Sequence, residues 1–151
     1  AHHMWQGDRS AFDGAHVHAE MPISNPQPLS QPHPPILIGG MGERKTLRLA
    51  AQYADAINFF GRAGAETLTQ KLGVLREHCD TLGRDFDAIE KTTLNTVHLA
   101  PGEMSVADVI ATFKEQASLG FTHAIVNMPN VHEITPVETM VKEVIPAVAD
   151  L

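Results

Sequence analysis

The chain has 151 residues, which is the length of about one domain. It carries 11 Lys and Arg against 18 Asp and Glu, and this net charge of −7 argues against a nucleic-acid or acidic-membrane partner. No apolar run approaches the roughly 18 residues that span a bilayer, and the start lacks the pattern of a secretory signal. The single cysteine, Cys79, cannot form an internal disulfide. We therefore expect a soluble, cytoplasmic protein whose partners are small molecules.

The first 35 residues differ in composition from the rest of the chain. Residues 1–4 have the character of an expression-tag remnant and are left out of the functional argument. A dense group of prolines follows and disfavours a helix: Pro22, Pro26, Pro28, Pro32, Pro34 and Pro35. We predict an extended arm over residues 1–35 and a folded unit over residues 36–151.

From residue 36 onward, short apolar runs alternate with segments of helical period, which is typical of βα units. The predicted strands cover residues 36–38, 55–60, 91–99 and 124–128. Helices follow from about Glu43, over 68–82, from Ser105 and from Thr135. Cys79 falls on the apolar stripe of the second helix and is expected to be a core residue. Four consecutive units predict four parallel strands joined by right-handed crossovers.

Two of the helix starts carry capping signals. Ser105 with Asp108 forms an acidic variant of the capping box. Thr135 is the expected N-cap of the last helix, with Pro136 in its first turn and Glu138 as its box residue. A later proline, Pro146, should bend or shorten the last turn of that helix.

The strongest local motif is the glycine-rich turn Gly39-Gly40-Met41-Gly42-Glu43-Arg44-Lys45-Thr46, between a buried strand and a helix. Glycines let a ligand approach the backbone closely, and free N–H groups at a helix start beside Arg44 or Lys45 suit a phosphate. The motif is neither a Walker loop nor the spaced dinucleotide fingerprint. Both interpretations therefore stay open: a phosphate site, or a tight turn with solvated charges.

Other candidates carry weaker signals. The pair His16 and His18, with His33 nearby, lacks the Cys or carboxylate ligands of a recognisable metal set, so we predict loop histidines and no metal. No Ser-His-Asp set or pair of catalytic carboxylates can be placed by spacing, and the catalytic residues stay unassigned.

Phe59 and Phe60 close the second strand, where they either contact a ligand or belong to the core. Asn95 and Asn127 sit in otherwise apolar or β-branched strands and need hydrogen-bond partners. They either line a polar site or bond to one another.

Several segments together resemble the C-terminal half of a bacterial-luciferase-like oxidoreductase or monooxygenase. They are Met4-Trp5, Phe12-Asp13-Gly14, the stretch from Pro34 to Leu47, the stretch from Ala50 to Ala56 and Gly83-Arg84-Asp85. The resemblance is greatest to the branch that uses the deazaflavin coenzyme F420, with FMN as the alternative coenzyme. It implies the last four strands and helices of a TIM-type (β/α)8 barrel, which needs about 250 residues when whole. It further implies that the turn after the fifth barrel strand holds the coenzyme phosphate through Gly39, Gly40, Met41, Gly42, Lys45 and Thr46.

On this basis we expect a fragment or truncated member of the family, preceded by the Pro-rich arm and inactive alone. Half a barrel leaves its inner face and two strand edges open, so we expect a homo-oligomer. One alternative is a stand-alone doubly wound α/β domain that binds a phosphorylated ligand without catalysis, and another is a purely structural half-barrel that self-associates. Helix placement separates the doubly wound sheet from a half-barrel, because it has helices on both faces.

Overall fold

A computed structural model describes residues 1–151. The chain divides into two compact units, Ala1–Pro35 and Ile36–Leu151. None of the helices is long and apolar enough to cross a membrane.

The first unit contains little regular structure. It has a one-turn helix α1 (His2–Trp5) and a hairpin of β1 (Phe12–Asp13) and β2 (His18–Ala19), which pair antiparallel. None of these short elements was expected from the sequence. The proline-dense stretch from Pro22 to Pro35 forms no helix or strand, because proline removes the backbone donor that either would need.

The second unit is built on one parallel sheet of four strands. The strands are β3 (Leu37–Gly39), β4 (Ala56–Phe60), β5 (Glu90–Thr96) and β6 (His123–Asn127), and they lie side by side in chain order. Gly39 is in register with Asn58, Phe60 with Leu94, and Thr96 with Asn127. The predicted four-unit α/β fold is confirmed.

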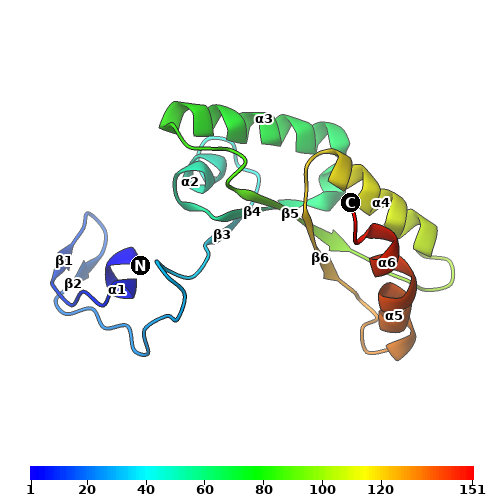
Figure 1. The fold of residues 1–151 in the computed structure, drawn as a ribbon, viewed down its shortest axis with the longest axis horizontal. Helices are drawn as coiled ribbons and strands as arrows, with labels where there is room; N and C mark the ends of the chain where they lie inside the picture. Colours follow the sequence, from blue (N-terminus) through cyan, green and yellow to red (C-terminus); the bar gives the residue numbers. More distant parts are fainter. The chain divides into compact units, whose positions relative to one another are not determined.

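Helices cover one face of this sheet (Figure 1). They are α2 (Thr46–Tyr53), α3 (Ala65–Leu82), α4 (Val106–Ser118), α5 (Ile134–Thr139) and α6 (Ile145–Val148), with a 3-10 turn η1 (Gly61–Ala63) and a π-helical segment η2 (Met140–Val144). Because the strand order never reverses, right-handed crossovers place successive helices on the same side. This is the arrangement of a partial barrel and not of a doubly wound sheet.

The core lies between the sheet and its helices. One cluster joins Ile57 and Phe59 of β4 to Leu47 of α2 and Leu75 of α3, all fully buried. A second cluster, around Val109, lies between α4 and the C-terminal helices. Full burial of side chains of this size stabilises a fold by about 1.5–3 kcal/mol each, so the helix-covered face carries much of the stability.

The predicted capping signals have different outcomes. At α4, the Ser105 hydroxyl accepts from the Asp108 N–H at 3.2 Å and the Asp108 carboxylate accepts from the Ser105 N–H at 2.9 Å, so the capping box is confirmed. The prediction that Thr135 caps the last helix is wrong. Helix α5 begins at Ile134, after Glu133, with no side-chain cap. Pro136 is tolerated in the first turn because the N–H groups there have no partner within the helix. A proline therefore does not identify the exact residue at which a helix begins.

Pro146 was expected to disturb the end of the last helix. The helix is interrupted by the π-helical segment η2, and Pro146 lies in the first turn of α6. A proline inside a continuous α-helix removes one backbone hydrogen bond. The wider π-helical turn of η2, directly before α6, is where the helix adjusts to this missing bond.

Candidate functional site

The carboxyl ends of all four strands meet at one edge of the sheet, which we call the carboxyl edge. The segments that leave this edge cover residues 40–45, 61–64, 97–105 and 128–133. Ligands of parallel α/β proteins bind outside the carboxyl ends of the strands. The glycine-rich turn predicted from the sequence is the first of these four segments.

The glycine-rich turn is tight and depends on its glycines. Gly40 has φ +125°, which disfavours any other residue, and its N–H donates to the Asn58 carbonyl at 3.0 Å. A Cβ on Gly42 would lie 3.0 Å from the Thr46 hydroxyl oxygen, and one on Gly40 would lie 3.2 Å from the Thr46 methyl carbon. Thr46 therefore packs directly against the turn.

The same turn offers unpaired backbone donors. No N–H from Met41 to Thr46 donates to another protein group, whereas the Leu47 N–H bonds to the Gly42 carbonyl at 3.0 Å. Helix α2 begins at Thr46 after Lys45 and has no side-chain cap, so the donors of its start are also available. A run of free N–H groups at a helix N-terminus attracts anions.

Helix α3 holds the turn in place through Glu43. The Lys71 ammonium lies 2.5 Å from the Glu43 carboxylate, and the His78 Nε2–H donates to the Glu43 carbonyl oxygen at 2.8 Å. The Lys71 contact neutralises the one acidic side chain of the turn. Arg44 and Lys45 are exposed and form no ion pair, so the turn presents net positive charge.

A pocket of about 500 Å³, which we call the edge pocket, opens at the carboxyl ends of β4, β5 and β6. Its lining includes Phe60, Arg62, Leu94, Thr96 and Asn127. The Arg62 guanidinium lies 5.6 Å from the centre of the Phe60 ring, within the range of a cation–π contact. The pocket therefore combines an aromatic face, apolar side chains and a few polar groups.

A buried cluster of polar side chains supports this pocket from the helix side. The Thr93 hydroxyl donates to the Gln116 amide oxygen at 2.7 Å, and the Gln116 amide donates to the Asn95 oxygen at 2.8 Å. Gly61 lies on this cluster so closely that a Cβ there would be 2.1 Å from the Asn95 oxygen. The position of the turn after β4 is thereby fixed.

The two asparagines singled out in the sequence thus have separate roles. Asn95 is buried and bonded to Thr93 and Gln116, and it makes no bond to Asn127. Asn127 is exposed and lines the edge pocket. The sequence left both possibilities open. Both asparagines line the edge pocket, but only the Asn127 side chain there is without a hydrogen-bond partner.

The two aromatic residues at the end of β4 also differ in their surroundings. Phe59 is fully buried and packs edge-on against Phe121, with ring centres 5.6 Å apart. Phe60 is 46% exposed and lines the edge pocket. Alternation along the strand sends one ring to the core and the next to the open face.

Cys79 is buried, as predicted, and burial raises the pKa of its thiol, which lowers its reactivity. Of the histidines in the first unit, His18 pairs with Asp13 and the His33 ring stacks on Trp5. No group of three or more His, Cys, Asp or Glu side chains is arranged to hold a metal ion.

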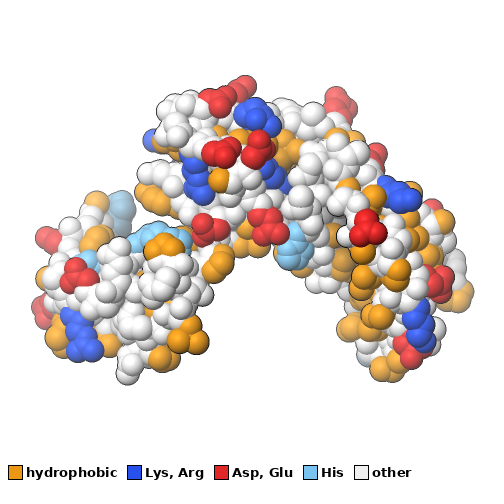
Figure 2. Space-filling view, in the orientation of Figure 1, with side chains coloured by type: hydrophobic (Ala, Val, Ile, Leu, Met, Phe, Trp, Pro, Cys, Tyr) orange, Lys and Arg blue, Asp and Glu red, His pale blue; other side chains and the backbone are white.

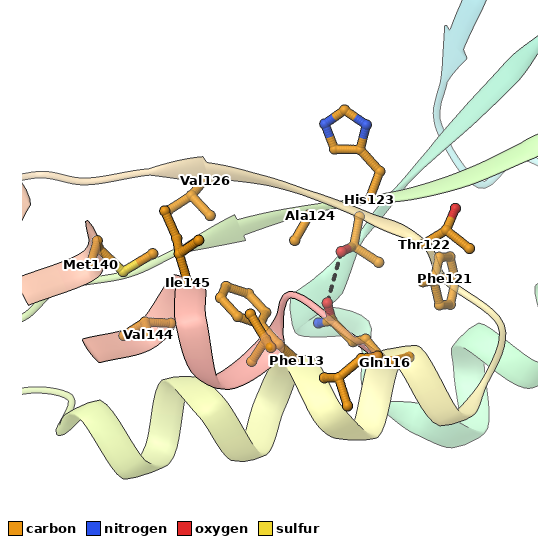
Figure 3. Close-up of a pocket in the computed structure, with 14 residues that line it drawn as sticks. Phe113, Gln116, Phe121, Thr122, His123, Ala124, Val126, Met140, Val144 and Ile145 are labelled. Carbon is orange, nitrogen blue, oxygen red and sulfur yellow. Dashed lines mark hydrogen bonds between the residues drawn. The ribbon is translucent and has the colours of Figure 1, made fainter. Parts of the chain in front are cut away.

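A second pocket, of about 380 Å³, lies on the helix side of β6 (Figure 3). We call it the helix pocket. Phe113 of α4, Val126 of β6 and Met140 of η2 line it, and the Gln116 amide in its wall is already hydrogen-bonded. The His123 ring points to the opposite side of β6 (Figure 3). Because its lining is mostly apolar and its Gln116 amide is already paired, this pocket is a poorer candidate than the carboxyl edge.

Comparison with known proteins assigns the chain to a family. The family model of luciferase-like monooxygenases matches residues 1–138. The chain belongs to this family. The resemblance predicted from the glycine-rich turn and its flanking segments is therefore confirmed. A search of curated proteins gives no match.

Solved structures agree on the fold. An F420-dependent secondary alcohol dehydrogenase, in complex with an F420-acetone adduct, is similar with a TM-score of 0.77 and 18% identity, over 97% of this chain and 58% of that one. A coenzyme F420 dependent tetrahydromethanopterin reductase from Methanopyrus kandleri is similar with a TM-score of 0.78 and 12% identity, over 97% of this chain and 60% of that one. The chain thus spans about three fifths of the length of these structures.

Sequence reasoning missed two features of the carboxyl edge. One is Arg62, whose position directly after a strand and a glycine could have indicated it. The other is the attachment of Glu43 to Lys71 and His78. No sequence pattern marks that contact, because it depends on how α2 and α3 pack.

Proposed function

We propose that this chain carries the coenzyme-phosphate-binding part of an oxidoreductase that exchanges a hydride with coenzyme F420 or FMN. The family supports an oxidoreductase, and the two similar structures are named as F420-dependent enzymes. The observation that carries the proposal is the turn from Gly39 to Thr46, where free N–H groups coincide with Lys45 and Arg44.

The residues present fit such a coenzyme. A Cβ on Gly39 would meet nothing within 4 Å, so the backbone at the end of β3 is open to close approach. The free N–H groups of residues 41–46 can donate to phosphate oxygens, and Lys45 adds a charge. The Thr46 hydroxyl lies at the start of α2, where it can donate to the same group.

When bound, the coenzyme supplies the hydride donor or acceptor. The work of this chain is to anchor the coenzyme tail at the turn and to limit where the ring can lie. Glu43, held by Lys71 and His78, keeps the turn from moving. Phe60 and Leu94 offer apolar surface at the carboxyl edge, and Asn127 offers an amide that can orient a polar ring. Positioning of this kind reduces the entropy cost of the reaction.

Substitution of Lys45 tests the anchoring role. Lys45→Ala should weaken the binding of F420 or FMN, measured by calorimetry, by roughly 1–3 kcal/mol, the range for loss of a charge-assisted contact. Lys114→Ala, at an exposed position on α4, is the matched control and should leave affinity unchanged. Unchanged affinity in Lys45→Ala would remove this side chain from the site.

We further propose that this 151-residue chain does not turn over by itself. Four strands supply one side of a pocket, and effective molarity is lost when the reactants are not held from both sides. A spectrophotometric assay with reduced or oxidised F420, and with reduced FMN, should show no hydride transfer. Steady turnover by this chain would contradict the proposal.

Self-association follows from the open face. Leu37 and Phe60 on that face are 49% and 46% exposed, and β3 and β6 each have one unpaired edge. Exposed apolar surface and bare edges favour association, so we propose a homo-oligomer, most simply a two-fold dimer. Light scattering at micromolar concentration tests this. A monomer that binds no hydrophobic dye would contradict it.

A further inference from the structure

Arg62 is the one Lys or Arg side chain that lines the edge pocket, and it has no polar partner. Its guanidinium forms no ion pair or hydrogen bond and lies over the Phe60 ring, 5.6 Å from the ring centre. By contrast, Arg84 donates to the carbonyls of Ala51 and Ala54, and Lys91 donates to the carbonyl of Phe86. The donors of Arg62 are therefore free at the mouth of the edge pocket.

The backbone that carries Arg62 cannot shift easily. Gly61 contacts the buried Asn95 and Gln116 amides, so the residue before Arg62 is fixed against the sheet. Gly64, with φ +82°, closes the turn before α3 begins. A charged side chain on a fixed turn is suited to ligand recognition, since little backbone order remains to be gained on binding.

The edge pocket contains no acidic side chain to neutralise this charge. Its other polar groups are neutral, and they include the Thr96 hydroxyl and the Asn127 amide. Its apolar lining comes from Phe60, Leu94 and Met104. Together these groups suit a molecule with one anionic group and an apolar or aromatic body.

A guanidinium binds either a carboxylate or a phosphate, and the neighbouring turn makes the carboxylate the better choice for Arg62. Its planar fork matches a carboxylate through two parallel hydrogen bonds. A phosphate carries more charge, and the neighbouring turn from Met41 to Thr46 already offers it backbone donors and Lys45. The turn from Met41 to Thr46 thus suits a phosphate, and the turn that carries Arg62 suits a carboxylate.

We propose that Arg62 binds the carboxylate of the substrate, and that the substrates are small carboxylates with an apolar or aromatic body. The binding of a carboxylate at Arg62 does not depend on the proposed oxidoreductase function. Its assignment to a substrate rests on the proposed oxidoreductase function.

The test is a titration of the full 151-residue chain, followed by ¹H–¹⁵N NMR, with benzoate and inorganic phosphate as separate probes. Benzoate should shift the amide signals of Gly61, Arg62 and Asn127. Arg62→Gln should weaken benzoate binding about tenfold, as expected for the loss of a charge-assisted pair, and Arg62→Lys should restore only part of it. Arg9→Gln, at an exposed arginine without an ion pair in the first unit, is the matched control and should bind benzoate normally.

Phosphate should shift the signals of residues 41–46 in both the parent chain and Arg62→Gln. Benzoate binding that is absent, or equal in Arg62→Gln, overturns the carboxylate site, and so does phosphate binding that is lost in Arg62→Gln. If benzoate binds as expected while phosphate leaves residues 41–46 unshifted, the carboxylate site stands and the coenzyme-anchoring proposal fails. The spectrum of the unliganded Arg62→Gln variant shows directly whether it is folded.

Discussion

The two faces of the four-stranded sheet carry similar side chains in different surroundings. On the helix-covered face, Ile57 and Phe59 are fully buried under α2 and α3. On the open face, Leu37 and Phe60 remain about half exposed, at 49% and 46%. Phe59 and Phe60 are neighbours in the chain and chemically identical, so only the alternation of the strand separates a core residue from a surface one.

The polar groups differ between the faces in the same way. On the helix side, Thr93, Asn95 and Gln116 bond to one another and leave no unpaired atom. On the open side, the Thr96 and Asn127 side chains have no hydrogen-bond partner, although Asn58 accepts from the Thr92 hydroxyl at 2.9 Å. Satisfied polar groups stabilise a fold, and free ones at a pocket are available to a ligand. The paired groups of one face therefore contribute to stability, and the free groups of the other are those on which the proposed site depends.

The C-terminal helices, which cover one face of the sheet, also expose apolar side chains that are not part of the candidate site. Figure 2 shows hydrophobic side chains gathered over the C-terminal helices. Ile134, Val141 and Ile145 are 71%, 57% and 51% exposed there. Apolar exposure alone does not identify a site, because a ligand site also needs a few polar groups placed to orient the ligand.

The largest expected effect comes from substituting the two phenylalanines separately. Phe59→Ala should lower the free energy of unfolding by about 3–5 kcal/mol, because it leaves a cavity beside Phe121. At concentrations low enough for the chain to be a monomer, Phe60→Ala should lower it by less than about 1 kcal/mol, because the ring is already half in solvent. Urea unfolding followed by circular dichroism measures both. Equal losses would show that the open face is covered in solution.

The next effect tests the buried polar cluster. Gln116→Leu should cost about 2–3 kcal/mol, because the buried Thr93 hydroxyl loses its acceptor and the buried Asn95 oxygen loses its donor. Gln52→Leu, at an exposed position on α2, is the control and should change stability little. A Gln116→Leu variant as stable as the parent would mean that the cluster does not hold the turn after β4.

A smaller effect is expected at the start of α4. Ser105→Ala should cost about 1 kcal/mol, because it removes the acceptor for the Asp108 N–H. Thermal unfolding at neutral pH measures the loss. Thr112→Ala, further along the same helix, is the comparison and should cost less, because it removes no cap.

The same box makes a pH-dependent contribution with a defined sign. Hydrogen bonds from Ser105 lower the pKa of Asp108 in the folded chain. Its stabilising effect is therefore complete above the ordinary aspartate pKa of about 3.9 and is lost as pH falls through the lower folded value. Asp108→Asn should be less stable than the parent at neutral pH and should approach it in acid. A constant difference across this range would contradict the assignment.

The sequence was sufficient where the structure depends on local signals. The capping box of Ser105 and Asp108 involves residues close in the chain and was located correctly. The glycine-rich turn does lie between a strand and a helix, but the helix begins at Thr46 and not at about Glu43, as predicted. The prediction of a partial barrel came from the family resemblance and not from these local signals. Features that join distant segments could not be read in this way. The contact of Glu43 with Lys71 spans 28 residues and depends on the packing of α3 against the turn.

Position along a strand also limited the prediction. The sequence could not tell whether Asn95 faces the helices or the open side, because β5 has polar or β-branched residues on both faces. Both amides line the edge pocket, but only Asn95 is hydrogen-bonded to the buried cluster, and the register of Thr96 with Asn127 places the Asn127 side chain on the open side. The start of α5 was misplaced because a proline is tolerated anywhere in a first helical turn.

The central claim is that the turn from Gly39 to Thr46 holds the phosphate of a deazaflavin or flavin coenzyme. The most direct measurement is a ¹H–¹⁵N NMR titration of the chain with F420 or FMN, compared with the same coenzyme lacking its phosphate. The account predicts that the amide signals of residues 41–46 shift with the phosphorylated form and far less with the other. Equal shifts with both forms, or shifts confined to other segments at saturation, would contradict it.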